Sequence, residues 1–186
     1  LFGHYMKNSK MFGNLVEYKT VDGYKRAPVI EFNTIYGDYK WKVFAAFITN
    51  GTPEGDEDYM FNYTFTNLSN ATVTQNFLNE VYQRTLYTTG VDVAPTDKIL
   101  TLSTCTYEFD EARLVIMARM VSPGESEQVD TSKIRYNTNP RYPAAYYKEN
   151  PDRIPKFIYV DYMDYGEEYD YELLNRNIDD LSELFS

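Results

Sequence analysis

Alternating apolar and polar positions predict β-strands in the first third of the chain. Over residues 29–36 apolar and polar side chains alternate, and residues 37–38 then give a turn signal. Residues 39–49 return as a second strand, whose later part, residues 43–48, loses the alternation. That loss is typical of a strand that is covered on both faces. Ahead of these strands, residues 21–23 carry another turn signal.

Apolar residues at helical spacing predict two helices in the first half of the chain. A short helix is expected near residues 11–18, where apolar residues stand three and four positions apart. A longer helix is expected over residues 72–86, with Thr72 or Thr74 as its N-cap. The only histidine of the chain, His4, then falls in the loop before the first helix.

Two further strands flank a short acidic loop in the middle of the chain. The first starts near residue 99 and ends on Cys105, the only cysteine. The second opens at Arg113 and continues to Val121. The loop over residues 107–112 holds too many acids for a core segment. We therefore expect the thiol to be accessible and Arg113 to lie beside it across the sheet.

The last fifty residues differ in character from the rest. Four prolines among tyrosines over residues 137–155 favour an extended segment over a helix. Apolar residues spaced four, three and four apart over residues 174–185 predict an amphipathic helix, which we expect to dock on its own domain. The chain is thus divided into a globular domain, 1–136, and a Pro/Tyr-rich segment with an acidic C-terminal amphipathic helix, 137–186.

Composition narrows the function classes. The net charge of −10 argues against nucleic acid and against a polybasic membrane patch. One cysteine excludes an internal disulfide, and one histidine makes a zinc site improbable, so neither a metal nor a cofactor is expected. The acids at 54–58 favour a solvated turn over a calcium loop. The chain starts at Leu1 without an initiator Met, and we interpret it as a piece of a longer precursor.

A single thiol, a single imidazole and a nearby guanidinium are the components of a cysteine acyl-transfer site. Each also has an ordinary structural explanation. A lone cysteine is most often a small buried side chain, and a lone histidine is usually structural or exposed. Arg113 could simply form an ion pair with Glu108, Asp110 or Glu111. These alternatives remain open from the residues alone.

Three blocks of sequence resemble the sortase family. Residues 101–105, followed by Arg113, resemble its Thr-Leu-x-Thr-Cys…Arg signature. Residues 3–7 resemble the Gly-His-Asn-Met block that carries the family's histidine, although Tyr5 replaces the usual Asn. The insertion over residues 63–95, with its predicted helix, resembles that of class B sortases. Residues 39–44 resemble class B as well, and the whole resemblance runs from about Gly3 to Val121.

The resemblance implies a mostly β fold, a sortase-like mixed β-barrel with short helices that lacks the elements preceding the family's histidine. It implies a cysteine transpeptidase that cleaves an Asn-Pro-x-Thr-like C-terminal sorting signal after Thr and passes the acyl group to an amine of the cell wall or of a pilin. By position, Cys105 is the nucleophile, His4 the general acid/base and Arg113 the group that stabilises substrate and oxyanion. Ser103 and Thr104 line the site and bind substrate.

The resemblance also implies partners and a location. The partners are the sorting-signal peptide of surface proteins and an amine acceptor from peptidoglycan or a pilin. The location is the outer face of a Gram-positive cell membrane, with the membrane anchor outside this sequence. Two rival interpretations are a cysteine peptidase that acts mainly as a hydrolase and an inactive β-rich binding module. Papain-like peptidases place their cysteine at a helix start, whereas Cys105 is expected at the end of a strand.

Overall fold

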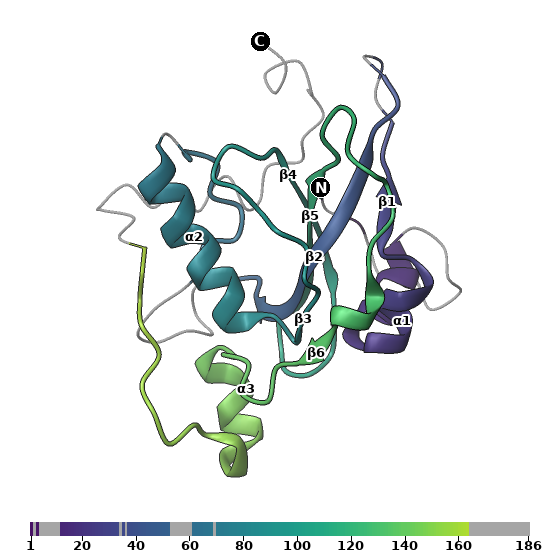
Figure 1. The fold of residues 1–186 in the computed structure, drawn as a ribbon. Helices are drawn as coiled ribbons and strands as arrows, with labels where there is room; N and C mark the ends of the chain where they lie inside the picture. Colours follow the sequence, from purple (N-terminus) through teal and green to yellow (C-terminus); the bar gives the residue numbers. More distant parts are fainter. Residues whose placement is uncertain are drawn as a thin grey trace.

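A four-stranded sheet forms the centre of the molecule in the computed structural model, which describes residues 1, 3, 12–33, 35, 37–52, 61–68 and 70–163. Neighbouring strands are antiparallel, and the sheet curls around its long central strand (Figure 1). Its strands, in spatial order, are β1 (Val29–Glu31), β2 (Lys40–Asn50), β5 (Ala112–Met120) and β4 (Ile99–Cys105). A separate two-stranded sheet pairs β3 (Tyr87–Thr88) with β6 (Arg135–Tyr136).

Residues at the start of the chain extend the sheet beyond β4. The Ser103 N–H donates to the Leu1 carbonyl over 2.9 Å, and the Gly3 N–H donates to the Ser103 carbonyl over 3.1 Å. The backbone nitrogen of Leu1 also donates to Thr101 over 2.7 Å. Residue numbers rise together along both partners, so this pairing is parallel. The sheet is therefore mixed, and the expected mostly β architecture with short helices is confirmed.

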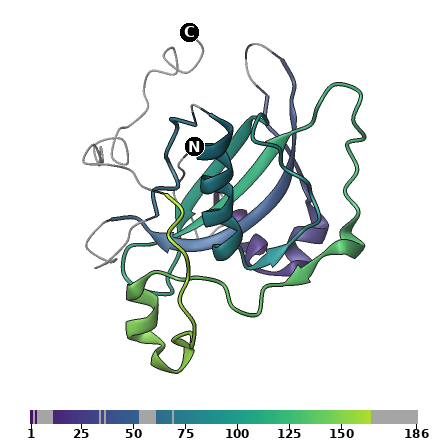
Figure 2. The same cartoon turned by 60° about the vertical axis from the view of Figure 1, so that its left-hand side comes forward.

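Helices cover both faces of the sheet. On one side lies α2 (Ala71–Arg84), and on the other lies α1 (Val21–Arg26), preceded by a 3₁₀ helix, η1 (Phe12–Lys19) (Figure 2). Two apolar clusters follow from this arrangement, one under α2 and one under η1 and α1. Every residue of β2 after Lys40 is buried, which confirms that this strand is covered on both faces.

Local capping explains two differences from the sequence expectations. The turn expected at residues 21–23 is instead the start of α1, because the Thr20 hydroxyl accepts a hydrogen bond from the Gly23 N–H over 3.0 Å. Helix α2 begins earlier than expected. Asn70, rather than Thr72 or Thr74, is its N-cap and accepts from the Val73 N–H over 3.0 Å.

The first strand also differs from its prediction. It was expected over residues 29–36, but β1 ends at Glu31, and only three of its residues pair with β2. The short helix expected near residues 11–18 is confirmed as η1, in 3₁₀ form.

The expectation of an extended segment over residues 137–155 is wrong in part. Helix α3 (Ala144–Glu149) and a 3₁₀ turn, η4 (Pro151–Arg153), lie within it, and another 3₁₀ turn, η3 (Thr131–Lys133), precedes it. Prolines permit these helices because they stand at the N-termini, Pro143 as the cap of α3 and Pro151 in the first turn of η4. A proline there removes an N–H that a helix would leave unpaired in any case.

Beyond η4 the chain returns along α2. The Gln83 amide donates to the Val160 carbonyl over 2.8 Å and accepts from the Val160 N–H over 3.1 Å. Met163 is buried in the apolar cluster under α2. The amphipathic helix predicted over 174–185 and the acidic residues at 54–58 lie outside the described residues, and the division at residue 136 stays a prediction.

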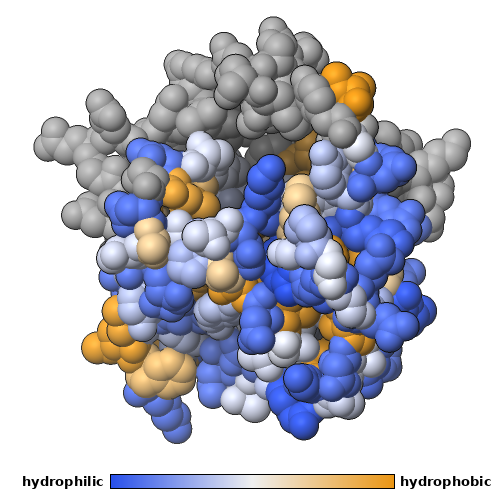
Figure 3. Space-filling model, turned by 45° about the horizontal axis from the view of Figure 1, so that its top comes forward, coloured by the Kyte–Doolittle hydropathy of each residue, from blue (hydrophilic) through white to orange (hydrophobic). Residues whose placement is uncertain are grey.

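The described surface is largely hydrophilic on the face shown in Figure 3, where hydrophobic residues form only small patches. Within the described ranges, no helix combines the length and the apolar character that a bilayer span requires. The same residues contain no group of three potential metal-ligating side chains close enough to hold an ion.

Candidate active site

Cys105 and Arg113 stand directly opposite each other on neighbouring strands. In the antiparallel register of β4 and β5, Cys105 pairs with Arg113, the second residue of β5. Side chains at directly opposed positions leave the same face of a sheet, with Cβ atoms about 5 Å apart. Cys105 is the last residue of β4 and is partly exposed. A thiol and a guanidinium are thus adjacent at an accessible edge of the sheet.

Arg113 also has an acidic neighbour at the end of the loop. Its Nη2 atom lies 2.8 Å from a carboxylate oxygen of Glu111, and its Nη1 donates to the Ala112 carbonyl over 3.2 Å. Of the three acids that the sequence offered as partners, Glu111 is the one that forms this contact. The ion pair therefore exists together with the cross-strand position beside the thiol, so the two interpretations of Arg113 are compatible.

Ser103 shares the face of Cys105 and is bonded to a buried tyrosine. The hydroxyl oxygens of Ser103 and Tyr63 lie 3.2 Å apart, and both residues are buried. Burial raises the pKa of Tyr63, whereas the Ser103 hydrogen bond and the Arg113 charge act to lower it. Tyr63 is therefore within electrostatic reach of the site. Sequence reasoning missed it because an aromatic residue in a loop carries no signal of its distant partner.

Thr104 points away from Cys105, since successive residues of a strand face opposite sides of the sheet. Its side chain is buried, and its hydroxyl has no hydrogen-bond partner among the described residues. Asn50 of β2, which pairs with Ala112 of β5, is buried as well, and neither polar atom of its side-chain amide has a partner in the part of the chain that the structure describes. Unpaired buried polar groups are costly and uncommon. The buried polar groups on this side of the sheet are therefore less completely hydrogen-bonded than those of an ordinary protein core.

His4 lies outside the described residues. Gly3, the residue that precedes it in the sequence, donates its N–H to Ser103, two positions before the cysteine. The structure thus brings Cys105, Arg113 and Ser103 to one face, turns the Thr104 side chain to the other, and gives no position for the histidine.

Three polar side chains, those of Lys19, Thr106 and Glu108, connect the loop after Cys105 to η1. The Lys19 ammonium donates to both Thr106 and Glu108, and the Thr106 hydroxyl donates to Glu108 over 2.7 Å. Burial acts to raise the pKa of Glu108, but the hydrogen bonds from Lys19 and Thr106 outweigh it and hold that pKa below its usual value. The start of the loop, directly after Cys105, is therefore held against η1.

Comparisons with known proteins identify similar sequences and structures. No family model matches the chain. Sortase B of Staphylococcus aureus is 32% identical over 123 residues, which cover 65% of this chain and 47% of that protein. Sortase B of Listeria monocytogenes is 30% identical over 124 residues, covering 66% of this chain and 47% of its own length.

Solved structures give the same result. The crystal structure of Staphylococcus aureus sortase B has a TM-score of 0.56 at 33% identity and shares 66% of this chain and 55% of that one. The sortase B–substrate complex of the same organism has a TM-score of 0.55 at 32% identity, over 65% of this chain and 53% of that chain.

In sequence and in fold, the chain is similar to class B sortases over about two thirds of its length. It spans about half the length of the curated relatives it matches.

Proposed function

We propose that the protein is a sortase-type cysteine transpeptidase. It cleaves a C-terminal sorting signal after Thr and transfers the acyl group to an amine. The observation that carries the proposal is the register of β4 and β5, in which Cys105 and Arg113 are direct cross-strand neighbours. The likeness to class B sortases supports it, and one of the similar structures is a sortase B–substrate complex.

In the proposed reaction, the Cys105 thiolate attacks the carbonyl carbon of the signal's Thr. The charge that develops on the carbonyl oxygen is stabilised by N–H donors of Arg113, whose guanidinium stays protonated throughout. His4 protonates the leaving amine as the peptide bond breaks, which produces a thioester on Cys105. An acceptor amine then attacks the thioester, gives a proton to His4, and releases the thiolate.

The nearby residues have supporting roles in this proposal. Ser103 lies on the same face as the thiol and is fixed by Tyr63, so it forms part of the wall beside the bound signal. Thr104 faces the other side of the sheet, so its contribution is to hold the end of β4 against β5 and thereby to fix the position of Cys105. His4 follows Gly3, and the Gly3–Ser103 hydrogen bond supports its assignment to this site.

The finer details follow from analogy with class B sortases. The signal is Asn-Pro-x-Thr-like, the acceptor is an amine of peptidoglycan or of a pilin, and the protein acts on the outer face of a Gram-positive cell membrane.

A mass-spectrometric assay with candidate signal peptides, with and without amines, tests the proposal. The wild type should form a covalent adduct on Cys105 and an amine-exchanged product, and Cys105→Ala should form neither. Asp110→Asn, which removes an exposed charge from the same loop, is the matched control and should behave as the wild type. Free acid as the sole product would favour a hydrolytic peptidase. An adduct that survives in Cys105→Ala, or none in the wild type, would overturn the proposal.

A further inference from the structure

The end of the loop between β4 and β5 has an unusual backbone. Glu111 has a φ of 56°, and among the described residues it is the one non-glycine residue with positive φ. Glycine, asparagine or aspartate ordinarily occupies such a left-handed position. The Glu111 carbonyl accepts a hydrogen bond from the Gly51 N–H over 2.9 Å, which ties the loop to the end of β2. The turn alone does not explain why a glutamate, rather than one of these three residues, occupies this position.

The glutamate side chain supplies such a reason. Its carboxylate holds the Arg113 Nη2 at 2.8 Å, with the Glu111 side chain 52% exposed and that of Arg113 23% exposed. An ion pair this exposed contributes little to stability. Its effect is therefore mainly on the orientation of the guanidinium.

Gly51 packs directly against the same guanidinium and limits where it can lie. A Cβ built on Gly51 would lie 2.6 Å from Cζ, 2.8 Å from Nε and 2.9 Å from Nη2 of Arg113. The guanidinium thus rests against the glycine backbone, at a distance that only glycine allows. These atoms are the far end of a flexible side chain, so an added methyl group would displace the guanidinium and leave the backbone in place.

We infer that Glu111 is a positioning residue that, with Gly51 as a floor, holds the Arg113 guanidinium beside Cys105 in the orientation that the reaction requires. Two of the five N–H groups of the guanidinium are used, one by Glu111 and one by the Ala112 carbonyl. The guanidinium forms no further hydrogen bond within the described residues, and in this proposal its other N–H groups bind the substrate. The inference rests on the proposed function for its kinetic consequences, although the geometry of the guanidinium can be tested without it.

A double-mutant cycle tests whether Glu111 acts through Arg113. Asparagine tolerates the left-handed backbone but has a shorter, uncharged side chain, so Glu111→Asn removes the ion pair with little disturbance of the turn. We expect kcat/KM to fall at least about tenfold, mainly through kcat. In an Arg113→Lys background the same substitution should have no further effect. Equal losses in both backgrounds would mean that Glu111 serves only the loop, and would overturn the inference.

Gly51→Ala approaches the guanidinium from the other side. It should lower kcat about as much as Glu111→Asn while the melting temperature stays unchanged, and Asp110→Asn should change neither. A Gly51→Ala variant with wild-type kcat would count against the inference.

A readout that needs no substrate separates this inference from the proposed function. NMR of the Arg113 Nε–H group should show a rigid group in the wild type. In both Glu111→Asn and Gly51→Ala, its resonance should shift and the group should become mobile. A resonance that is unchanged in both variants would refute the positioning role. A wild type that is inactive but shows these shifts would refute the transpeptidase and leave the positioning role standing.

Discussion

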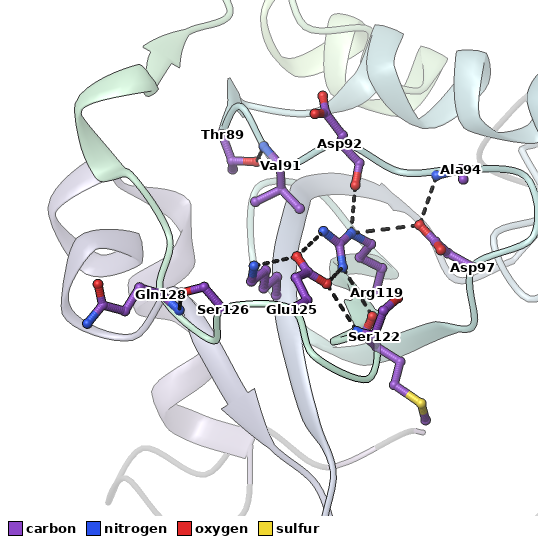
Figure 4. Close-up of polar contacts among 12 residues, drawn as sticks. Thr89, Val91, Asp92, Ala94, Asp97, Arg119, Ser122, Glu125, Ser126 and Gln128 are labelled. Atoms are coloured by element: carbon purple, nitrogen blue, oxygen red, sulfur yellow. Dashed lines mark hydrogen bonds and ion pairs between the residues drawn. The ribbon is translucent and has the colours of Figure 1, made fainter.

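Two arginines of the same strand, Arg113 and Arg119, differ in how many neighbouring groups contact the guanidinium. They stand six residues apart on β5 and therefore project from the same face of the sheet. Arg119 contacts Glu125 through two nitrogens, over 2.7 and 2.6 Å, and donates its Nε–H to the Asp92 carbonyl over 2.6 Å (Figure 4). Asp97 adds a carboxylate at 3.7 Å. Arg113, at the other end of the strand, has one acid and one carbonyl.

The difference separates a structural arginine from one that is available for chemistry. Arg119 is nearly buried and its guanidinium is occupied by neighbours, so it joins the segment before β4 to the segment after β5 and offers little to a ligand. Arg113 is more exposed, uses fewer of its donors in contacts with the described residues, and lies opposite the thiol. The comparison predicts that mutations at the two positions affect different properties, stability at Arg119 and turnover at Arg113.

Arg119→Met should produce the largest loss of stability. Methionine leaves the carboxylate of Glu125 in a partly buried site, where Lys42 and the Ser122 N–H are its remaining partners among the described residues, so we expect the free energy of unfolding to fall by about 3–5 kcal/mol. Urea denaturation measures this directly. The matched control is Arg26→Met, whose exposed ion pair with Glu17 should contribute less than about 1 kcal/mol. Equal effects at the two positions would remove the structural role assigned to Arg119.

Arg113→Lys should give the complementary result. Lysine keeps the charge but loses the planar fork of donors, so we expect kcat/KM with a sorting peptide to fall about 10²-fold. The free energy of unfolding should change by less than about 0.5 kcal/mol, because the ion pair with Glu111 is exposed. Steady-state kinetics and urea denaturation of the same variant provide both values. A variant that turns over normally would show that charge alone suffices at this position.

The sequence could predict the pairing of Cys105 with Arg113 but not the contrast between the two arginines. A short loop between two apolar runs implies an antiparallel hairpin, in which residues near the loop must face each other. The distinction depends on Asp92, 27 positions from Arg119, and on Glu125, beyond the end of the strand. Periodicity contains no information on such partners. For the same reason, three acids remained possible for Arg113 until the left-handed backbone of Glu111 selected one.

The helices show the same limit at short range. Spacing identified α2 to within a residue or two but not its cap, since Asn70, Thr72 and Thr74 are all acceptable caps by type. Proline content led to a wrong expectation for α3 and η4, because a proline inside a helix and one at its first turn look alike in composition. The apolar pattern thus predicts the long strands and α2 but not the short helices α1 and α3, and the ends of the elements and the polar contacts between them depend on residues that it does not identify.

The pH dependence of Glu125→Gln gives the finest test of the comparison. Hydrogen bonds from Arg119 and Lys42 hold the pKa of Glu125 well below its usual value of about 4.5. Glutamine has no charge to satisfy these two cations, so we expect the variant to be less stable by about 1–3 kcal/mol at pH 7. A carboxyl whose pKa is lower in the folded state stabilises the fold fully above its unfolded pKa and loses that contribution as the pH falls.

The stability gap between wild type and Glu125→Gln should therefore be constant from pH 7 to about pH 5 and shrink below about pH 4.5. Urea denaturation over this range measures it, and Glu127→Gln is the control, since its ion pair with Lys40 is exposed and should leave a gap below about 1 kcal/mol. A gap that stays unchanged to pH 2 would mean that the charge of Glu125 is irrelevant. In that case packing and hydrogen bonds alone would hold Arg119 in place, and charge would not distinguish its surroundings from those of Arg113.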